Sequence, residues 1–304
     1  MKILFATDGS EYSERAAKFL TRMNWSPEDS ITVFHAVYAV PFQHDEKFHY
    51  DTLKAIKKDI APRILDSALA VLKPVRAKLS VEIEEFSPGK CTPDQCIVKA
   101  ADSSDSDLIV MGARGVKGIA SAFLGSVTRL AAINSPVPVL AVKPGALVNP
   151  ETMKVLFAID GSASSRASGE FLASLPFPDS TEITLLNVVS SSFSDVPERF
   201  TLEINDRIKE VVAKMREREL AESEKTIEQA RAPLRKRFKN ISALSKVGDP
   251  SAEILDMAKT MAADMITVGC RGLKGVKGVM GSVSRNVLTH SGCSVLIGKT
   301  CKES

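Results

Sequence analysis

The sequence predicts an α/β protein made of two tandem, doubly wound domains, each built on a parallel sheet. Three observations lead to this prediction. Short apolar segments of strand length alternate with longer segments that have helical spacing. The strand segments are hydrophobic almost throughout, as expected of parallel strands that helices cover on both faces. The same order of segments occurs twice along the chain.

Four apolar segments mark expected strands of the first repeat. They read ILFAT, ITVFHAV, DLIVMG and VPVLAV, while a fifth segment, VEIEEF, alternates and is therefore expected nearer an edge of the sheet. Helical spacing covers residues 14–23 and 51–79, and Pro62 and Pro74 are expected to kink or divide the second of these helices. A further helix is expected over residues 127–134, with Ser126 as its N-cap.

The second half of the chain repeats the first. KILFATDGS at residues 2–10 returns as KVLFAIDGS at 154–162, and SDLIVMGARG at 106–115 returns as ADMITVGCRG at 263–272. Each copy runs about 150 residues, so a whole domain is duplicated and the chain is not a solenoid of short repeats. We expect domains at residues 1–145 and 153–304, joined by a turn-rich linker near residues 144–152.

Composition narrows the class of protein. The chain has 304 residues, a net charge of +3 and 44% hydrophobic residues, which is typical of a soluble globular protein and too weakly basic to indicate nucleic acid as a partner. No apolar run approaches the roughly 18 residues of a membrane span. The N-terminus lacks a signal-peptide pattern, so a cytoplasmic location is expected.

Metal and disulfide chemistry are not indicated by the residue pattern. The five cysteines are odd in number and form no CxxC motif. His44 and His49 share a stretch with two acidic residues, which we interpret as a polar loop in preference to a metal site. The charge-rich segment 200–238 is interpreted as a solvated helix face in preference to a partner-binding arm.

The glycines that follow the DLIVMG strand predict an anion site. Their spacing is Gly112-x2-Gly115-x9-Gly125-Ser126, so a strand end, a glycine loop and a helix start follow one another. The first N–H groups of a helix point outward and its dipole favours negative charge. Glycine lets phosphate oxygens approach the backbone because no Cβ intervenes. The same arrangement recurs in the second repeat, which favours a functional role over simple turns.

Asp8 and Asp160 follow the first strand of each repeat and belong at the same edge of the sheet. A carboxylate there can accept a ribose hydroxyl or hold a metal on phosphate, and it can equally cap the next helix. The chain has no GxxxxGK[ST] motif, and no GxGxxG follows its first strand, which excludes a P-loop nucleotidase and disfavours a dinucleotide fold. No Ser-His-Asp arrangement is indicated, since His35 lies in a strand.

On these residues the sequence resembles the universal stress protein family. The matching features are the Asp-Gly-Ser after the first strand, the DLIVMG strand and the G-x2-G-x9-G-S spacing, and they cover both halves. The resemblance implies a five-stranded parallel α/β domain in each half and ATP as the ligand. It implies that Asp8 contacts ribose or phosphate and that Ala36 faces adenine through its backbone. The full set of implied nucleotide-binding residues is Asp8, Ala36, Gly112, Arg114, Gly115, Gly125, Ser126 and Val127 in the first repeat, and Asp160, Val188, Gly269, Gly272, Gly281 and Ser282 in the second.

The two repeats differ at two places near this site. Between Gly272 and Gly281 the second repeat has eight residues where the first has nine, which is expected to displace Gly281 and Ser282 and favours the first repeat as the nucleotide site. The first repeat reads GKCTPDQCI at residues 89–97 where the second reads GDPSAEI, an insertion of two residues. The family resemblance also implies that VPVLAVK and CSVLIGK pair within one chain as a pseudo-dimer, and a further homodimer of two chains is compatible with the sequence.

The leading hypothesis is an ATP-binding universal stress protein with a regulatory or stress-response role that holds ATP with Mg²⁺. No general base recurs in both repeats, so no catalytic residue is assigned, although slow hydrolysis is compatible with a bound Mg-ATP. Two alternatives stay open: an enzyme of the related adenine-nucleotide α-hydrolase group, which cleaves or transfers adenylate, and an interaction module with a vestigial nucleotide site. DGSEYS and DGSASS stand where adenylate-forming members carry an SGGxDS-type loop, which disfavours the enzyme.

Overall fold

The computed structural model describes residues 1–38, 47–86, 91–114, 124–144, 152–189, 206–272 and 280–299. The strands are β1 (Lys2–Ala6), β2 (Ser30–Tyr38), β3 (Lys78–Phe86), β4 (Leu108–Gly112), β5 (Val139–Val142), β6 (Lys154–Ile159), β7 (Glu182–Val189), β8 (Asn240–Val247), β9 (Met265–Gly269) and β10 (Ser294–Gly298). The helices are α1 (Glu11–Leu20), α2 (Lys47–Leu72), α3 (Pro93–Ser103), α4 (Ser126–Asn134), α5 (Ala163–Ser174), α7 (Asp206–Leu234), α8 (Pro250–Thr260) and α9 (Ser282–His290).

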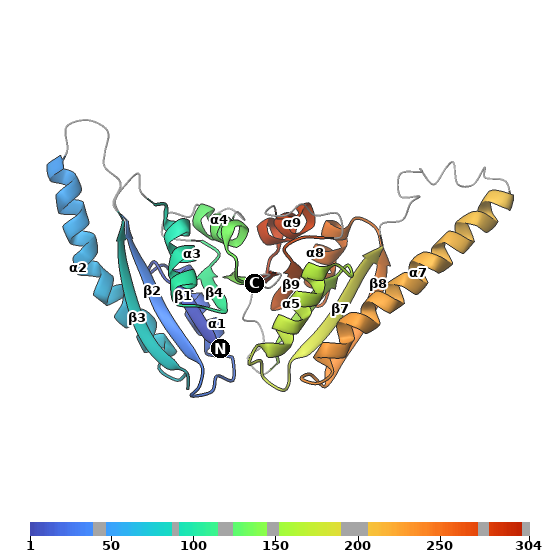
Figure 1. Ribbon diagram of the computed structural model, residues 1–304, viewed down its shortest axis with the longest axis horizontal. Coiled ribbons are helices and arrows are strands. Elements are labelled where there is room, and N and C mark those ends of the chain that lie inside the picture. The colour runs from blue at the N-terminus through green and yellow to red at the C-terminus, as the bar shows by residue number, and fades with distance from the viewer. Residues whose placement is uncertain are drawn as a thin grey trace.

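Within the described ranges the strands form one ten-stranded sheet in the order β3-β2-β1-β4-β5-β10-β9-β6-β7-β8 (Figure 1). Each half contributes five strands, and all neighbours within a half are parallel. In the first half the chain adds β2 and β3 on one side of β1 and then β4 and β5 on the other, so the strand order switches between β1 and β4. In the second half it switches in the same way between β6 and β9. This confirms the predicted doubly wound, five-stranded halves. VEIEEF lies in β3, which is an edge strand as expected.

Helices cover both faces of the sheet, which explains why the strands are apolar throughout. On one face, α1, α2, α5 and α7 pack their buried residues against the sheet in a single hydrophobic cluster that includes Phe19, Leu65 and Leu172. On the other face, α3, α4, α8 and α9 form a second cluster that includes Ile97 and Val287. Both clusters contain residues of both halves, so the core of the protein is continuous across the duplication.

The halves join through their last strands. β5 and β10 pair antiparallel, with Leu140 opposite Leu296 and Val139 opposite Ile297, which confirms the expected pairing of VPVLAVK with CSVLIGK. Figure 1 shows the consequence: the halves lie side by side around this seam, and α2 and α7 lie at the two outer flanks. Away from the seam, Arg22 of the first half forms an ion pair with Asp264 of the second, with 3.5 Å between Nη1 and Oδ1.

Two lysines that follow the joined strands cap helices across the seam. Lys143 Nζ donates to the carbonyl oxygens of Ser291 (2.8 Å) and Thr289 (3.4 Å) at the end of α9. Lys299 Nζ donates to those of Ala132 (2.8 Å) and Ile133 (3.3 Å) in the last turn of α4. A cation at a helix C-terminus meets unpaired carbonyls and the negative end of the dipole. Burial lowers the pKa of Lys143 to about 8 and also lowers the pKa of Lys299.

The helix α2 corrects one expectation and α7 supports another. Pro62 lies inside α2 without dividing it, because Ala61 and Leu65 are buried against the sheet on both sides of the proline and hold the helix there. The helix ends at Leu72, so the predicted helical stretch is interrupted before Pro74 as expected, and its last residues, 78–79, belong to β3. The described residues of α7 between positions 213 and 222 are almost all exposed, which is consistent with the interpretation of a solvated helix face.

Candidate functional site

The turn after β1 places Asp8 at the carboxyl edge of the sheet. Asp8 Oδ1 accepts from the N–H of Ser10 (3.1 Å), and Gly9 between them has a φ of +75°, a conformation that favours glycine. Ser10 is the N-cap of α1, and its Oγ accepts from the N–H of Ser13 (3.3 Å). The helix is therefore capped by Ser10, and of the two roles considered for Asp8 the N-cap is the wrong one.

The second half builds the same turn after β6. Asp160 Oδ1 accepts from the N–H of Ser162 (3.0 Å), Gly161 has a φ of +75°, and Ser162 caps α5 by accepting from the N–H of Ser165 (3.1 Å). The sequence repeat thus corresponds to a repeat of backbone geometry. Asp8 and Asp160 lie at equivalent positions.

Buried side chains on β2 and β7 hydrogen-bond to the backbone just before these two turns and hold it in place. His35 is buried, and its Nδ1 lies 2.8 Å from the carbonyl oxygen of Thr7. In the second half Asn187 Nδ2 donates to the carbonyl oxygen of Ile159 (2.7 Å). His35 is therefore a tether between β2 and the end of β1. It was not among the predicted site residues, and the signal that would have found it is the polar residue at the same place in both apolar strands.

Gly112 ends β4, and the structure provides a reason for glycine that differs from the predicted one. A Cβ at this position would lie 2.6 Å from the carbonyl carbon of Tyr12 and 2.8 Å from the backbone nitrogen of Ser13. At Gly269 a Cβ would meet Ser164 and Ser165 at 2.9–3.0 Å. Both glycines let the first helix of their half pack against the strand end, so close helix packing by itself accounts for them.

The start of α4 lies next to the end of β4. Gly125 N–H donates to the carbonyl oxygen of Ala113 (2.8 Å), and Gly125 is the N-cap of α4. Ser126 is the first helical residue and is exposed, so the predicted N-cap is wrong by one position. The first amide that bonds back into the helix belongs to Arg129, which donates to Gly125 O (3.0 Å). The N–H groups of the preceding turn, including those of Ser126 and Val127, have no acceptor within the helix and receive no side-chain cap from Gly125.

The start of α9 has the same geometry as the start of α4. Gly281 N–H donates to the carbonyl oxygen of Cys270 (2.8 Å), Gly281 is the N-cap, and Ser282 is the exposed first helical residue. Relative to the strand end, Gly281 and Ser282 therefore lie where Gly125 and Ser126 lie in the first half. Their expected displacement relative to Gly272 stays a prediction, since Gly115 and residues 273–279 lie outside the described residues. A Cβ on Gly272 would lie 2.9 Å from Asp160 Oδ2, so this part of the loop passes close to the carboxylate.

The arginine two residues after each strand end, Arg114 or Arg271, has different contacts in the two halves. Arg114 Nη1 donates to Tyr12 Oη (3.3 Å), and its guanidinium carbon lies 5.5 Å from the centre of the Tyr12 ring. In the second half Ser164 stands in place of Tyr12. There Arg271 is tied through its backbone, since its carbonyl oxygen accepts from Ser162 Oγ (3.2 Å). Tyr12 was not predicted as a site residue, and its place on α1 gave no signal in the sequence.

The expected adenine contacts lie at the carboxyl ends of β2 and β7. Ala36 pairs in register with Glu84, and Val188 pairs with Lys246. Lys246 Nζ forms ion pairs with Glu253 (2.7 Å) and Asp256 (3.4 Å), and these carboxylates raise its pKa. The two halves therefore present opposite charges beside the corresponding positions.

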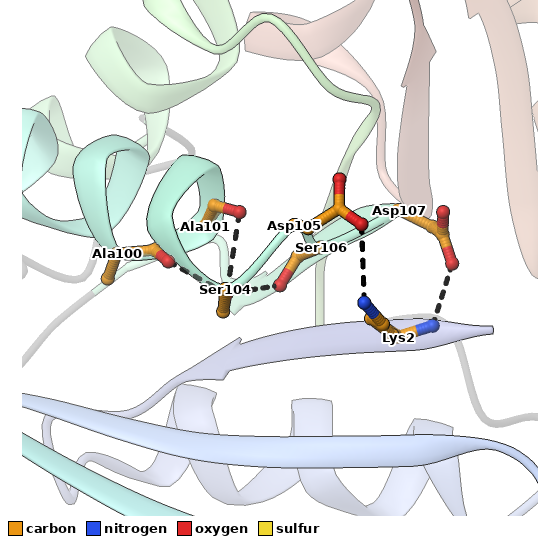
Figure 2. Close-up of polar contacts among 7 residues, drawn as sticks. All are labelled: Lys2, Ala100, Ala101, Ser104, Asp105, Ser106 and Asp107. Atoms are coloured by element: carbon orange, nitrogen blue, oxygen red, sulfur yellow. Dashed lines mark hydrogen bonds and ion pairs between the residues drawn. The ribbon is translucent and has the colours of Figure 1, made fainter.

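The opposite, amino edge of the sheet has contacts between Lys2 and two aspartates, and two hollows, but none of the predicted site residues that the structure describes. Figure 2 shows Lys2 there: its N–H donates to Asp107 Oδ2 (2.7 Å), and its Nζ pairs with Asp105 Oδ2 (3.2 Å). Two hollows of about 530 and 340 Å³ lie near this edge, one beside residues 262–263 and 290–293, the other beside residues 105–107 and 136–138. Neither is lined by a predicted site residue. In parallel α/β sheets ligands bind beyond the carboxyl ends of the strands.

Some predicted positions cannot be placed. Gly115 lies outside the described residues, as do residues 273–279 of the second loop. His44 lies outside them too, and nothing is described of the His49 side chain. Among the side chains that are described, no group of three or more His, Cys, Asp or Glu is arranged to hold a metal ion. The described helices include none long and apolar enough to cross a membrane.

Comparison with known proteins decides the family. The model of the universal stress protein family matches residues 1–143 and again residues 151–299. The chain belongs to the universal stress protein family. A universal stress protein of Thermus aquaticus is 33% identical over 141 residues, which are 46% of this chain and 97% of the relative. One of Bacillus subtilis is 32% identical over 154 residues, 47% of this chain and 97% of the relative.

A solved universal stress protein has the size of the whole chain. The crystal structure of a universal stress protein from Archaeoglobus fulgidus covers 100% of this chain, and 97% of that chain is covered, with 21% identity and a TM-score of 0.63. At this identity the likeness shows the fold alone. The protein is thus a tandem member of the universal stress protein family, and membership supports a role in the stress response.

Proposed function

We propose that this universal stress protein is a regulatory ATP-binding protein of the stress response, and that it holds Mg-ATP at the carboxyl edge of its first half. In this proposal the chain divides into domains at residues 1–145 and 153–304. The first domain carries the nucleotide. The second has the same framework with a weaker site or none.

The observation that carries the proposal is the placement of the α4 N-terminus. It lies hydrogen-bonded to the end of β4, at the switch in strand order where doubly wound sheets bind ligands. Its first-turn N–H groups have no acceptor within the helix, and the Ser126 hydroxyl is exposed beside them. Amides that have no acceptor within the helix, a helix dipole and a hydroxyl together match the chemistry of a phosphate.

The remaining residues fit the other parts of the ligand. Asp8 lies at the same edge and has the chemistry to accept a ribose hydroxyl or to ligate Mg²⁺ on phosphate oxygens. Ala36 offers its backbone to adenine at the end of β2. Arg114, held over Tyr12, brings a positive charge beside the helix start. Gly115 completes the set as a position where backbone approaches phosphate.

The second half has the same framework with different groups around it. Its loop has one residue fewer and passes close to the Asp160 carboxylate at Gly272. The Arg271 backbone is bound by Ser162, and Lys246 is engaged by two carboxylates. We therefore assign Asp160, Val188, Gly269, Gly272, Gly281 and Ser282 to a site of lower affinity.

The chemistry of the first half favours retention of the nucleotide over turnover. A dedicated hydrolase needs a general base within reach of the attacking water. His35, the buried histidine nearest the turn, has Nδ1 engaged at the Thr7 carbonyl and serves as a tether. In this proposal the regulatory information lies in whether the protein is nucleotide-bound or nucleotide-free. ATP is hydrolysed slowly at most.

The test is to identify the nucleotide that the protein carries. Freshly purified full-length chain is denatured, and the released small molecules are separated and identified by mass spectrometry. The measurement is repeated on Gly115→Val and Gly272→Val, which alter equivalent loops. We expect adenine nucleotide from the parent chain and from Gly272→Val, and its loss from Gly115→Val. Absence of nucleotide, together with no binding of added Mg-ATP, refutes the proposal. Rapid multiple turnover of ATP would instead support the alternative of an adenine-nucleotide α-hydrolase enzyme.

A further inference from the structure

Two cysteines lie at the start of α3, in the segment where the first half has two extra residues. Thr92 is the N-cap and Pro93 is the first helical residue. Thr92 N–H donates to Gln95 Oε1 (3.0 Å), which completes a capping box. Cys91 therefore stands just before the cap and Cys96 stands at the fourth helical position. Side chains at these two positions meet across the first turn, as in a hydrophobic staple.

The two thiols differ in their exposure to solvent. Cys91 is partly exposed, while Cys96 is only 1% exposed. Cys91 Sγ donates a weak hydrogen bond to Thr92 O (3.5 Å). Burial, together with the neighbouring Cys91 thiol, raises the pKa of Cys96 well above its usual range, so Cys96 keeps its proton. The pair thus combines one thiol that solvent reaches with one buried, protonated thiol at the paired position of the same turn.

The second half shows that the fold does not need these cysteines. Its shorter segment begins α8 with Asp249 as the N-cap, whose Oδ1 accepts from Ala252 N–H (2.8 Å). Glu253 occupies the position of Cys96 and forms an ion pair with Lys246 (2.7 Å). An equivalent helix therefore starts without any thiol. The insertion in the first half adds Cys91 just before the N-cap, at the position that pairs with Cys96 across the first turn.

We propose that Cys91 and Cys96 form a reversible disulfide when the protein meets a peroxide, which makes the start of α3 a redox modification site. The Cys91 sulfur attacks one peroxide oxygen and the O–O bond breaks, giving a sulfenic acid at Cys91 and releasing one water. The Cys96 sulfur then attacks the Cys91 sulfur, the S–S bond forms and the S–O bond breaks. The leaving hydroxide takes up the Cys96 proton as a second water. Both thiols are oxidised by two electrons in total and hydrogen peroxide is reduced to two waters.

Trypsin provides a direct readout, because it cleaves after Lys90 and after Lys99 and so releases one peptide, CTPDQCIVK, that holds both cysteines. Native full-length protein is treated with hydrogen peroxide, remaining thiols are alkylated after denaturation, and the digest is examined by mass spectrometry. We expect this peptide to lose two hydrogens and carry no alkyl group, and the free-thiol count to fall by two from the five of the reduced chain. Dithiothreitol should restore both.

Matched variants separate this pair from general oxidation. Cys91→Ser should abolish the loss of two hydrogens and leave Cys96 alkylated, because a buried thiol is then left alone. Cys96→Ser should leave Cys91 as a sulfenic acid that dimedone labels. Cys293→Ser, which removes a buried cysteine elsewhere, should not change the peptide. The proposal is overturned if the native peptide stays doubly alkylated after peroxide, or if Cys91→Ser loses as many thiols as the parent chain.

Discussion

The two halves of the molecule have the same backbone and different side chains around the candidate site. The turn after the first strand has the same Asp, the same glycine at φ +75° and the same serine cap in both. The helix start is tied to the strand end by a hydrogen bond of 2.8 Å in both. Around this framework Tyr12 is replaced by Ser164, Glu84 by Lys246 and Cys96 by Glu253. The duplication has thus preserved the bonds that build this edge and changed the side chains around it.

The largest expected effect concerns the glycines at the strand ends. Gly112→Ala should lower the free energy of unfolding by about 2–3 kcal/mol, because its Cβ would lie 2.6 Å from backbone atoms of α1 that cannot move alone. Gly269→Ala should cost less, since its Cβ would lie farther from its neighbours, at 2.9 Å from a serine hydroxyl and 3.0 Å from backbone atoms of α5. Urea unfolding of both variants measures the difference. Equal costs would contradict the view that helix packing is tighter in the first half.

A pH-dependent effect is expected at the seam between the halves. Burial lowers the pKa of Lys143 to about 8 from its ordinary value of 10.5. Between these values the unfolded chain keeps a proton that the folded chain has released, so stability rises with pH there. The stabilisation that deprotonation of Lys143 gives to the folded state is fully present above pH 10.5 and is lost as the pH falls through about 8.

Lys143→Met should remove this contribution. The slope of unfolding free energy against pH, measured by urea titrations from pH 8 to 10, should fall by up to about 1.4 kcal/mol per pH unit. Lys299→Met is the matched variant across the seam, and it should also flatten the profile because burial lowers the pKa of Lys299 too. An unchanged slope in both variants would show that neither lysine is desolvated in solution.

A smaller effect, of the same size in both halves, is expected at the side-chain hydrogen bonds that join α4 to β4 and α9 to β9. Thr128 Oγ1 donates to Gly112 O and Ser284 Oγ donates to Gly269 O, each at 2.8 Å. Thr128→Val and Ser284→Ala should each cost about 1 kcal/mol of unfolding free energy, the typical net value of such a bond. Thermal or urea unfolding provides the comparison. A cost in one half only would break the equivalence of the two frameworks.

The sequence predicted what depends on patterns within a segment. The apolar strands, the duplication, the edge position of β3 and the place of Asp8 at the carboxyl edge follow from periodicity and from the parallel topology. The pairing of β5 with β10 was implied by the family resemblance and is confirmed.

Features that depend on distant contacts were not predictable from the sequence. The N-cap of α4 is Gly125 because its N–H bonds to Ala113, and both Gly125 and Ser126 have acceptable capping chemistry. Glycine at 112 is explained by α1, which lies about a hundred residues earlier in the chain. Pro62 is tolerated because the sheet holds α2 on both sides of it. The lysine caps require both halves to be in place.

The central claim is that the first half holds the nucleotide through the start of α4. Ser126→Pro tests it with little cost to the fold, because proline suits the first helical position and Gly125 has φ −62° and ψ 145°, which proline accepts before it. The change removes one N–H and the hydroxyl, while Ser126→Ala removes the hydroxyl alone. Ser282→Pro makes the same change in the second half, where Gly281 has φ −62° and ψ 156°.

The measurement is the affinity and stoichiometry of Mg-ATP binding by isothermal titration calorimetry on the full-length chain, with circular dichroism to confirm the fold of each variant. The account predicts one high-affinity nucleotide per chain. Ser126→Pro should weaken it roughly tenfold to a hundredfold, because a charge-assisted hydrogen bond is worth about 1.5–3 kcal/mol. Ser126→Ala should weaken it only a few fold, and Ser282→Pro should leave it unchanged. Binding that survives Ser126→Pro and is lost with Ser282→Pro would contradict the account.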